Sequence, residues 1–287
     1  MKKSFIFCAL SLISINLFAF GWPVENTESN SINSYFGQNR GDTLSTSLVF
    51  SEPTLVKSVE KGELLVLMTE EQDDSDFFPT TLGTSVIISH EDDLISVYGN
   101  LDKNTINSEL TKNTHIQSQT VLATTGMSGW QNNNSSLEFQ IIDTKNDVAI
   151  NPKILLDRLN NEFELFFSNV TLKNKNDVSF DLRTQRSFPA GVYRIYQKRD
   201  KVVSPYKTNI LLNGIISDQI SYDTIKEENN KLYVIGKKKY TSSNIYPNKE
   251  NQLLGEVMLT PGKNTLTIII SDFLGNQKQV NYFLSIY

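Results

Sequence analysis

Short segments rich in Val, Ile, Leu and Thr, separated by residues that favour turns, constrain the fold most strongly. Segments of this length and composition predict strands rather than helices. Few stretches have helical periodicity, and the best of them is residues 152–166, which begins with a proline that suits a helix start. The sequence therefore predicts a mostly β protein with antiparallel sheets, whose first strands are residues 55–59, 63–68, 85–89, 94–98, 120–124 and 137–142.

The strand pattern restarts near Ser187 and predicts a second β domain. Asn213-Gly214 lies between two apolar runs and is the strongest hairpin signal in the chain, because both residues tolerate positive φ. Later strands are predicted around residues 193–196, 208–212, 266–270 and 280–286, and together they indicate a small sandwich. The predicted organisation is a signal peptide (1–19), a first domain (20–160), a linker (161–186) and a β-rich C-terminal domain (187–287).

The N-terminus has the features of an export signal. Lys2 and Lys3 precede an apolar run from Phe5 to Phe20, and Ala19 supplies a small residue for cleavage. A membrane anchor is the alternative, but the run falls short of the roughly 20 residues that span a bilayer. We therefore expect secretion across the inner membrane into the periplasm or cell envelope, with no stable membrane span after cleavage. Cys8 leaves with the signal.

Charge and residue counts exclude several classes of protein. The chain of 287 residues has 27 Lys and Arg against 32 Asp and Glu, so nucleic acid is not an expected partner. It has two His and one Cys, which excludes a disulfide framework or a Cys/His metal cluster.

Two charged runs have alternative interpretations. Five carboxylates lie between Glu70 and Asp76, where calcium binding competes with a solvated hairpin loop. Because the central Gly and distant Glu of an EF-hand loop are missing, we favour the solvated loop. Lys237-Lys238-Lys239 could form a binding patch, but charges that protect an exposed strand end are the favoured interpretation.

Six segments resemble, in the correct order, motifs of the M23 peptidases (LytM/lysostaphin-type metalloendopeptidases), which cut peptide cross-links in peptidoglycan. The resemblance covers residues 22–156 and implies an M23/LytM-like antiparallel β-sheet domain. The matching segments are Tyr35-Phe36-Gly37-Gln38-Asn39-Arg40, residues 56–62, residues 86–90 with 97–101, Gly126-Met127-Ser128-Gly129, residues 136–141, and Ile150-Asn151-Pro152.

The departures from the family pattern fall on its chemistry. The resemblance places zinc ligands at Ser45, Val49 and Glu138, and residues that assist the attacking water at Asn100 and Ser136. A hydrolytic zinc needs three protein ligands and an open position for water. Ser is a weak ligand and Val is none, and neither Asn nor Ser can replace His as a base near neutral pH. His90 and His115 fall on none of these positions.

These substitutions predict a degenerate, catalytically inactive family member that holds no metal or other cofactor. The resemblance implies peptidoglycan or a cell-wall hydrolase as partner, because a groove without zinc can still bind an extended peptide. Two alternatives remain open, an active zinc peptidase with non-standard ligands and a structural protein that uses its C-terminal β domain for surface contacts. The predicted groove residues are Tyr98, Asn100, Ser128, Trp130, Ser136 and Glu138.

Overall fold

The structure is a computed structural model that describes residues 20–51, 54–69, 80–129, 135–200 and 204–287. The predicted signal peptide, the acidic run from Glu70 to Asp76 and Trp130 lie outside these residues. The described part is mostly β, as predicted, and its pairs are antiparallel apart from a short parallel one. No helix within it is long and apolar enough to cross a membrane.

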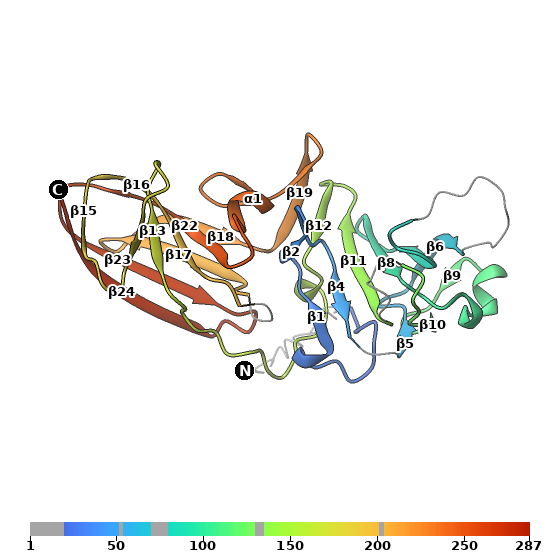
Figure 1. The fold of residues 1–287 in the computed structure, drawn as a ribbon. Helices are drawn as coiled ribbons and strands as arrows, with labels where there is room; N and C mark the ends of the chain where they lie inside the picture. The colour runs from blue at the N-terminus through green and yellow to red at the C-terminus, as the bar shows by residue number, and fades with distance from the viewer. Residues whose placement is uncertain (1–19, 52–53, 70–79, 130–134, 201–203) are drawn as a thin grey trace, which may run out of the picture.

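One large sheet organises the first half of the chain (Figure 1). Its strands follow the order β21-β20-β19-β12-β11-β8-β7-β6-β9, and β4 joins β11 and carries β1. Its members are β1 (Ile32–Ser34), β4 (Leu48–Phe50), β6 (Gly62–Met68), β7 (Ser85–Ser89), β8 (Leu94–Gly99), β9 (His115–Ile116), β11 (Leu137–Asp143), β12 (Val148–Ile150), β19 (Thr224–Glu228), β20 (Lys231–Ile235) and β21 (Lys239–Thr241).

Two small pairs flank this sheet. β5 (Leu55–Lys57) pairs with β10 (Val121–Thr124), and β2 (Asn39–Arg40) forms a hairpin with β3 (Thr43–Leu44). The described chain also has 3₁₀ turns at Ser29–Ser31, Lys103–Thr105, Ser108–Thr111 and Pro152–Ile154.

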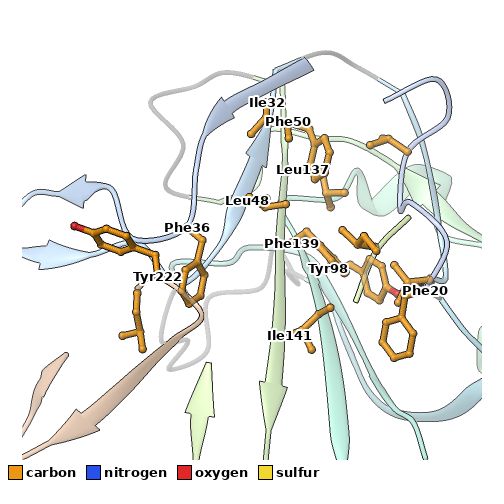
Figure 2. Packing of buried hydrophobic residues seen from close by; sticks show 14 of the residues in the cluster. Phe20, Ile32, Phe36, Leu48, Phe50, Tyr98, Leu137, Phe139, Ile141 and Tyr222 are labelled. Carbon is orange, nitrogen blue, oxygen red and sulfur yellow. Dashed lines mark hydrogen bonds between the residues drawn. The ribbon is translucent and has the colours of Figure 1, made fainter. Parts of the chain in front are cut away.

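Strand β11 separates the core from the polar side of the sheet. Leu137, Phe139 and Ile141 are fully buried and point to one face, where they pack in the first hydrophobic core (Figure 2). Because side chains alternate along a strand, Glu138 and Gln140 point to the opposite face. The same period of two that builds the core therefore places a carboxylate on the other side of the sheet.

The second half contains two further sheets, which pack into a sandwich around their own core. The first sheet has the order β14-β13-β16-β22 and the second β15-β24-β23-β17-β18. Asn213 and Gly214 have φ values of 52° and 83° and connect two of the strands, which confirms the predicted hairpin. The strands are β13 (Thr171–Lys173), β14 (Ser179–Asp181), β15 (Ser187–Phe188), β16 (Gly191–Lys198), β17 (Lys207–Leu212), β18 (Ile215–Ser221), β22 (Asn251–Leu259), β23 (Gly262–Ser271) and β24 (Gln277–Ile286).

Two local predictions are wrong. Residues 152–166 do not form a helix, since only the 3₁₀ turn Pro152–Ile154 follows the proline and the apolar residues beyond it pack individually. Residues 161–186 are not simply a linker, because they contain β13 and β14, and β13 pairs with β16. In both segments, packing against distant parts of the chain decides the conformation.

The sequence of the second half also completes the first sheet. Strands β19 to β21 extend that sheet through β12, with Ile225 directly opposite Ala149. The following short helix α1 (Ser242–Ile245) contacts the β2–β3 hairpin, where the Ser242 hydroxyl donates to the carbonyl oxygen of Thr43 at 3.2 Å. The Tyr246 hydroxyl donates to the carbonyl oxygen of Gly37 at 3.0 Å. The two halves are therefore joined by paired strands and shared packing.

Candidate functional site

The degenerate family positions meet at the beginning of β11. Glu138 is directly opposite Val49 of β4 on one side and Gly99 of β8 on the other. Directly paired residues share a face of the sheet, so the Val49 side chain lies beside the Glu138 carboxylate. Ser136 precedes Glu138 by two residues and forms an isolated bridge with Gly126.

A guanidinium group neutralises the carboxylate at this place. Both Glu138 oxygens accept from Arg40, and the Nη2–Oε2 distance is 2.9 Å. The Glu138 side chain is 3% exposed, whereas that of Arg40 is 38% exposed. The carboxylate raises the pKa of Arg40 above its usual value, mainly through these hydrogen bonds. A bidentate pair of this kind is the strongest form of ion pair that side chains make.

Two neutral side chains also donate to the carboxylate. The Ser47 hydroxyl donates to Glu138 Oε1 at 3.0 Å, and Gln140 Nε2 donates to the same atom at 3.3 Å. Ser45 does not bond the carboxylate in this network, because its hydroxyl donates to the Ser47 carbonyl oxygen and lies 3.3 Å from the Ser47 hydroxyl. Ser45 therefore supports Glu138 through Ser47.

Asn100 connects the other two positions. It follows β8 with a left-handed φ of 64°, a conformation that Asn tolerates better than most residues. Its amide nitrogen donates to the backbone oxygen and the hydroxyl of Ser136, at 2.7 and 3.1 Å. Its amide oxygen accepts from the Gly129 backbone at 2.7 Å. Asn100 thus holds the 126–129 loop against β11, and an amide in this arrangement cannot take a proton from water.

The donor set does not fit the zinc that the family resemblance implies. Of the three ligand positions, Val49 has no donor atom and Ser45 is engaged with Ser47. A metal at Glu138 would have to displace Arg40 from both carboxylate oxygens. Across the described ranges, no three His, Cys, Asp or Glu side chains gather in a way that could hold a metal ion. We therefore derive no chemical step through a metal.

The structure contradicts one predicted groove residue, Tyr98, and shows that several others are buried. Tyr98 is fully buried in the core, with its ring 5.3 Å from that of Phe139, so it cannot line a groove (Figure 2). Burial raises its pKa to about 12. Ser128 is half-buried and bonds Leu101 and Thr84. Asn100, Ser136 and Glu138 are buried, and Trp130 lies outside the described residues.

Neither histidine joins this cluster. His90 is buried, with its two ring nitrogens 2.8 Å from the Lys61 carbonyl oxygen and 2.7 Å from the Ser96 hydroxyl. Burial lowers the pKa of His90 below its ordinary value. His115 is exposed and pairs with Glu63 at 2.8 Å. These contacts agree with the interpretation of both residues as satisfied or solvated side chains.

Sequence reasoning missed Arg40 and Ser47 as members of the site. Arg40 ends the motif from Tyr35 to Arg40, and its positive charge was the signal that could have connected it with an acidic position such as Glu138. The β2–β3 hairpin that carries it turns at Gly41, whose φ of 67° suits glycine. Ser47 had no comparable signal, because an isolated serine before an apolar strand is common.

Comparisons with known proteins show which families parts of the chain resemble. The sequence model of peptidase family M23 matches residues 45–152, and a second family model matches residues 164–287. No curated protein matches the chain.

Three solved structures are similar to parts of the chain. A mutant catalytic domain of the prophage-encoded M23 protein EnpA from Enterococcus faecalis is 18% identical, with a TM-score of 0.35, over 42% of this chain and 88% of that one. A zinc-containing peptidase from Vibrio cholerae is 20% identical, with a TM-score of 0.34, over 43% of this chain and 36% of that one. The SpoIIQ–SpoIIIAH pore-forming complex gives 17% identity and a TM-score of 0.37, over 50% of this chain and 93% of that one. The similarity to peptidase family M23 rests on the sequence model and on the motif order, and it covers residues 45–152 of the chain.

Proposed function

We propose that this chain is an exported, catalytically inactive M23-type protein that acts in the cell envelope. Its role there is to bind peptidoglycan or to regulate a cell-wall hydrolase. The Arg40–Glu138 pair carries this proposal, because it places a cation of the chain itself against the only carboxylate at the three metal-ligand positions.

The electrostatics of the site support a binding role over a catalytic one. A buried carboxylate is a useful metal ligand when its charge is otherwise uncompensated, whereas Glu138 already has a bidentate guanidinium partner. A water molecule at this place would be activated by neither a metal nor a base, since Asn100 and Ser136 bond each other. Hydrolysis therefore lacks both of its usual contributors.

The same site can still contact a peptide. Arg40 remains partly exposed while it holds Glu138, and a guanidinium has five N–H donors. Some of these donors can bond a carboxylate of a peptide that lies across the sheet, and Gln140 is the neighbouring half-buried donor. The contact surface that we propose is therefore formed by Arg40 and Gln140 rather than by Tyr98.

Metal analysis and wall digestion test the inactive state. We expect the mature chain, purified in zinc-containing medium, to hold no stoichiometric zinc and to release no soluble fragments from purified sacculi. Stoichiometric zinc with cleavage of the sacculi would establish the competing function, an active metallopeptidase with unusual ligands.

Cosedimentation tests the binding role. We expect the mature chain either to cosediment with sacculi or to raise the rate at which a purified cell-wall amidase digests them. The variant Arg40→Gln should weaken the effect, whereas Lys61→Gln, which changes an exposed lysine in the same domain, should leave it unchanged. Absence of both effects in the unmodified chain would contradict the proposal.

A further inference from the structure

The middle of the outer side of the sheet β15-β24-β23-β17-β18 is an open surface without charged side chains. The alternate residues of these strands, such as Ile210, Ile268 and Leu284, are buried in the second core. The residues between them must point away from that core. Figure 1 shows β23 and β24 on the side of the sandwich away from β13 and β16.

One row of this surface crosses four strands in register. Asn281 is opposite Thr267, Thr267 is opposite Leu211, and Leu211 is opposite Ile216. The Thr267 hydroxyl donates to the Asn281 amide oxygen at 2.8 Å, which fixes the orientation of that amide. The row therefore begins with oriented polar groups and ends with aliphatic side chains.

A second row lies beside the first and has the same character. Gln279 is opposite Ile269, Ile269 is opposite Asn209, and Asn209 is opposite Gln219. No side chain of either row is charged, although 21% of the chain is Asp, Glu, Lys or Arg. We name the eight residues of these two rows, together with Phe283, the outer face.

Charge complementarity limits the partners that the outer face can bind. The nearest charged positions with the same orientation are lysines at opposite ends of the sheet, Lys207 and Lys263. A charged ligand would find no counter-charge within the two rows. Amide side chains both donate and accept hydrogen bonds, so they match a ligand that is covered with uncharged hydroxyl and amide groups.

Exposed apolar side chains add a second component. Phe283 is 74% exposed and continues β24 beyond Asn281, and Ile216 is 59% exposed at the far end of the first row. An exposed aromatic ring beside neutral polar groups suits a ligand with both apolar and hydroxyl-bearing faces. A sugar ring has that combination.

The size of the outer face argues against a stable protein partner. Four strands at spacings of about 4.8 Å and two rows about 7 Å apart cover about 14 Å by 7 Å, roughly 100 Å², and Phe283 adds one position beyond them. A standard protein interface buries about 800 Å² on each partner. A second copy of the chain would therefore need far more surface than these rows provide, whereas a narrow polymer chain would not.

We propose that the outer face binds an uncharged glycan chain, with hydrogen bonds to Asn209, Gln219 and Asn281 and a ring packed on Phe283. This inference rests on the proposed envelope function and deepens it. It assigns the glycan contact to the second half of the protein, while the first half contacts peptide.

Binding to chitin tests this site, because chitin is an uncharged glycan without stem peptides. We expect the full mature chain to bind chitin oligosaccharides, measured by calorimetry, with little change between about 0.05 and 0.5 M salt. The variants Phe283→Ala and Asn209→Ala/Gln219→Ala should each weaken binding at least about tenfold. Phe166→Ala is the matched control, since it removes a Phe that is 52% exposed outside the outer face and should leave binding unchanged.

Further measurements distinguish a failure of the glycan inference from a failure of the proposed function. Unchanged thermal unfolding of the Phe283→Ala variant would show that the fold is intact, as its exposure predicts. Binding to sacculi without binding to chitin would overturn the glycan inference and leave the proposed function standing. Chitin binding that Phe283→Ala does not weaken, or a Phe283-dependent dimer in sedimentation, would also overturn the inference. Chitin binding together with zinc-dependent wall cleavage would overturn the proposed function alone.

Discussion

Removing Arg40 should destabilise the fold, because the buried carboxylate of Glu138 would lose its cationic partner. Breaking a buried ion pair by removing one partner costs about 3–5 kcal/mol, because the other charge is left without compensation. Glu138 is 3% exposed, but Arg40 is 38% exposed, so water can enter the space that Arg40→Ala leaves. The hydrogen bonds from Ser47 and Gln140 also remain. We therefore expect Arg40→Ala to lower the free energy of unfolding by about 2 kcal/mol.

Tryptophan fluorescence during urea unfolding can measure this change in the first domain. The chain has two Trp, both in its first 160 residues. Trp22 packs 6.3 Å from the Phe50 ring and donates to the Asp157 carbonyl oxygen at 3.0 Å, so its emission reports this core. Lys61→Ala serves as control, since the Lys61–Glu91 pair is exposed and its loss should leave the free energy of unfolding almost unchanged.

A second substitution shows whether the uncompensated charge is the cause. Adding Glu138→Gln to Arg40→Ala removes that charge and should restore about 1 kcal/mol of the lost stability. Equal destabilisation by Arg40→Ala and Lys61→Ala would refute this reasoning, as would failure of Glu138→Gln to restore stability. Stabilisation of the unmodified chain by added zinc would refute the claim that the site does not fit the metal.

Three further predictions concern buried polar groups. Asn100→Ala should lower the free energy of unfolding, measured in urea, by about 2–3 kcal/mol, because the Gly129 N–H loses its acceptor and Ala must adopt a positive φ. Asn100→Gly should lower it less, because Gly tolerates a positive φ. Because burial lowers the pKa of His90 in the folded chain, the unfolded chain binds this proton first as the pH falls below about 6.5. The free energy of unfolding should therefore fall between pH 7.5 and pH 5, and it should fall less steeply in His90→Gln. Lys153→Met should lower the free energy of unfolding by about 3 kcal/mol, because the buried Glu162 side chain loses its cationic partner. The double variant Lys153→Met with Glu162→Met should return it to within about 1 kcal/mol of the original value, and thermal unfolding measures both changes.

Local patterns were sufficient for the elements that depend on local chemistry. The alternation in β11 predicted a strand with two different faces, and Asn213-Gly214 predicted the hairpin at the observed residues. The helix predicted after Pro152 failed because apolar residues at helical spacing also arise by chance in an irregular segment. There the buried pair of Lys153 with Glu162 holds the chain in a non-helical path.

Long-range neighbours explain what the sequence could not predict. The motif positions placed Asn100, Ser136 and Glu138 in one cluster, and the structure brings them together. The partner of Glu138 is 98 residues away in sequence, so no local pattern connects the two. The side of the sheet on which Tyr98 lies depends on its register with Phe139, and a shift of one residue would have placed it on the same face as Glu138.

The pairing of β12 with β19 makes the second half necessary for the first. A chain that ends at residue 187 would lose β19 to β21 and leave the edge of β12 unpaired. It would also uncover Phe36 and Gly37, against which Tyr222 packs (Figure 2). The side chains lost from the first core are Tyr196, Ile220, Tyr222, Ile225, Val234, Tyr240, Ile245, Tyr246 and Leu253.

At about 1.5 kcal/mol for each large side chain, this loss is on the order of 10 kcal/mol, comparable to the whole stability of a typical domain. We therefore expect residues 20–187 alone to show neither cooperative urea unfolding nor the native Trp22 emission. A cooperative transition with native emission would show that the first half folds independently and that β19 to β21 are dispensable. If the truncated chain fails to fold, its loss of wall binding cannot assign the contact to either half. Point variants such as Arg40→Gln and Phe283→Ala, which leave both cores intact, then provide that assignment.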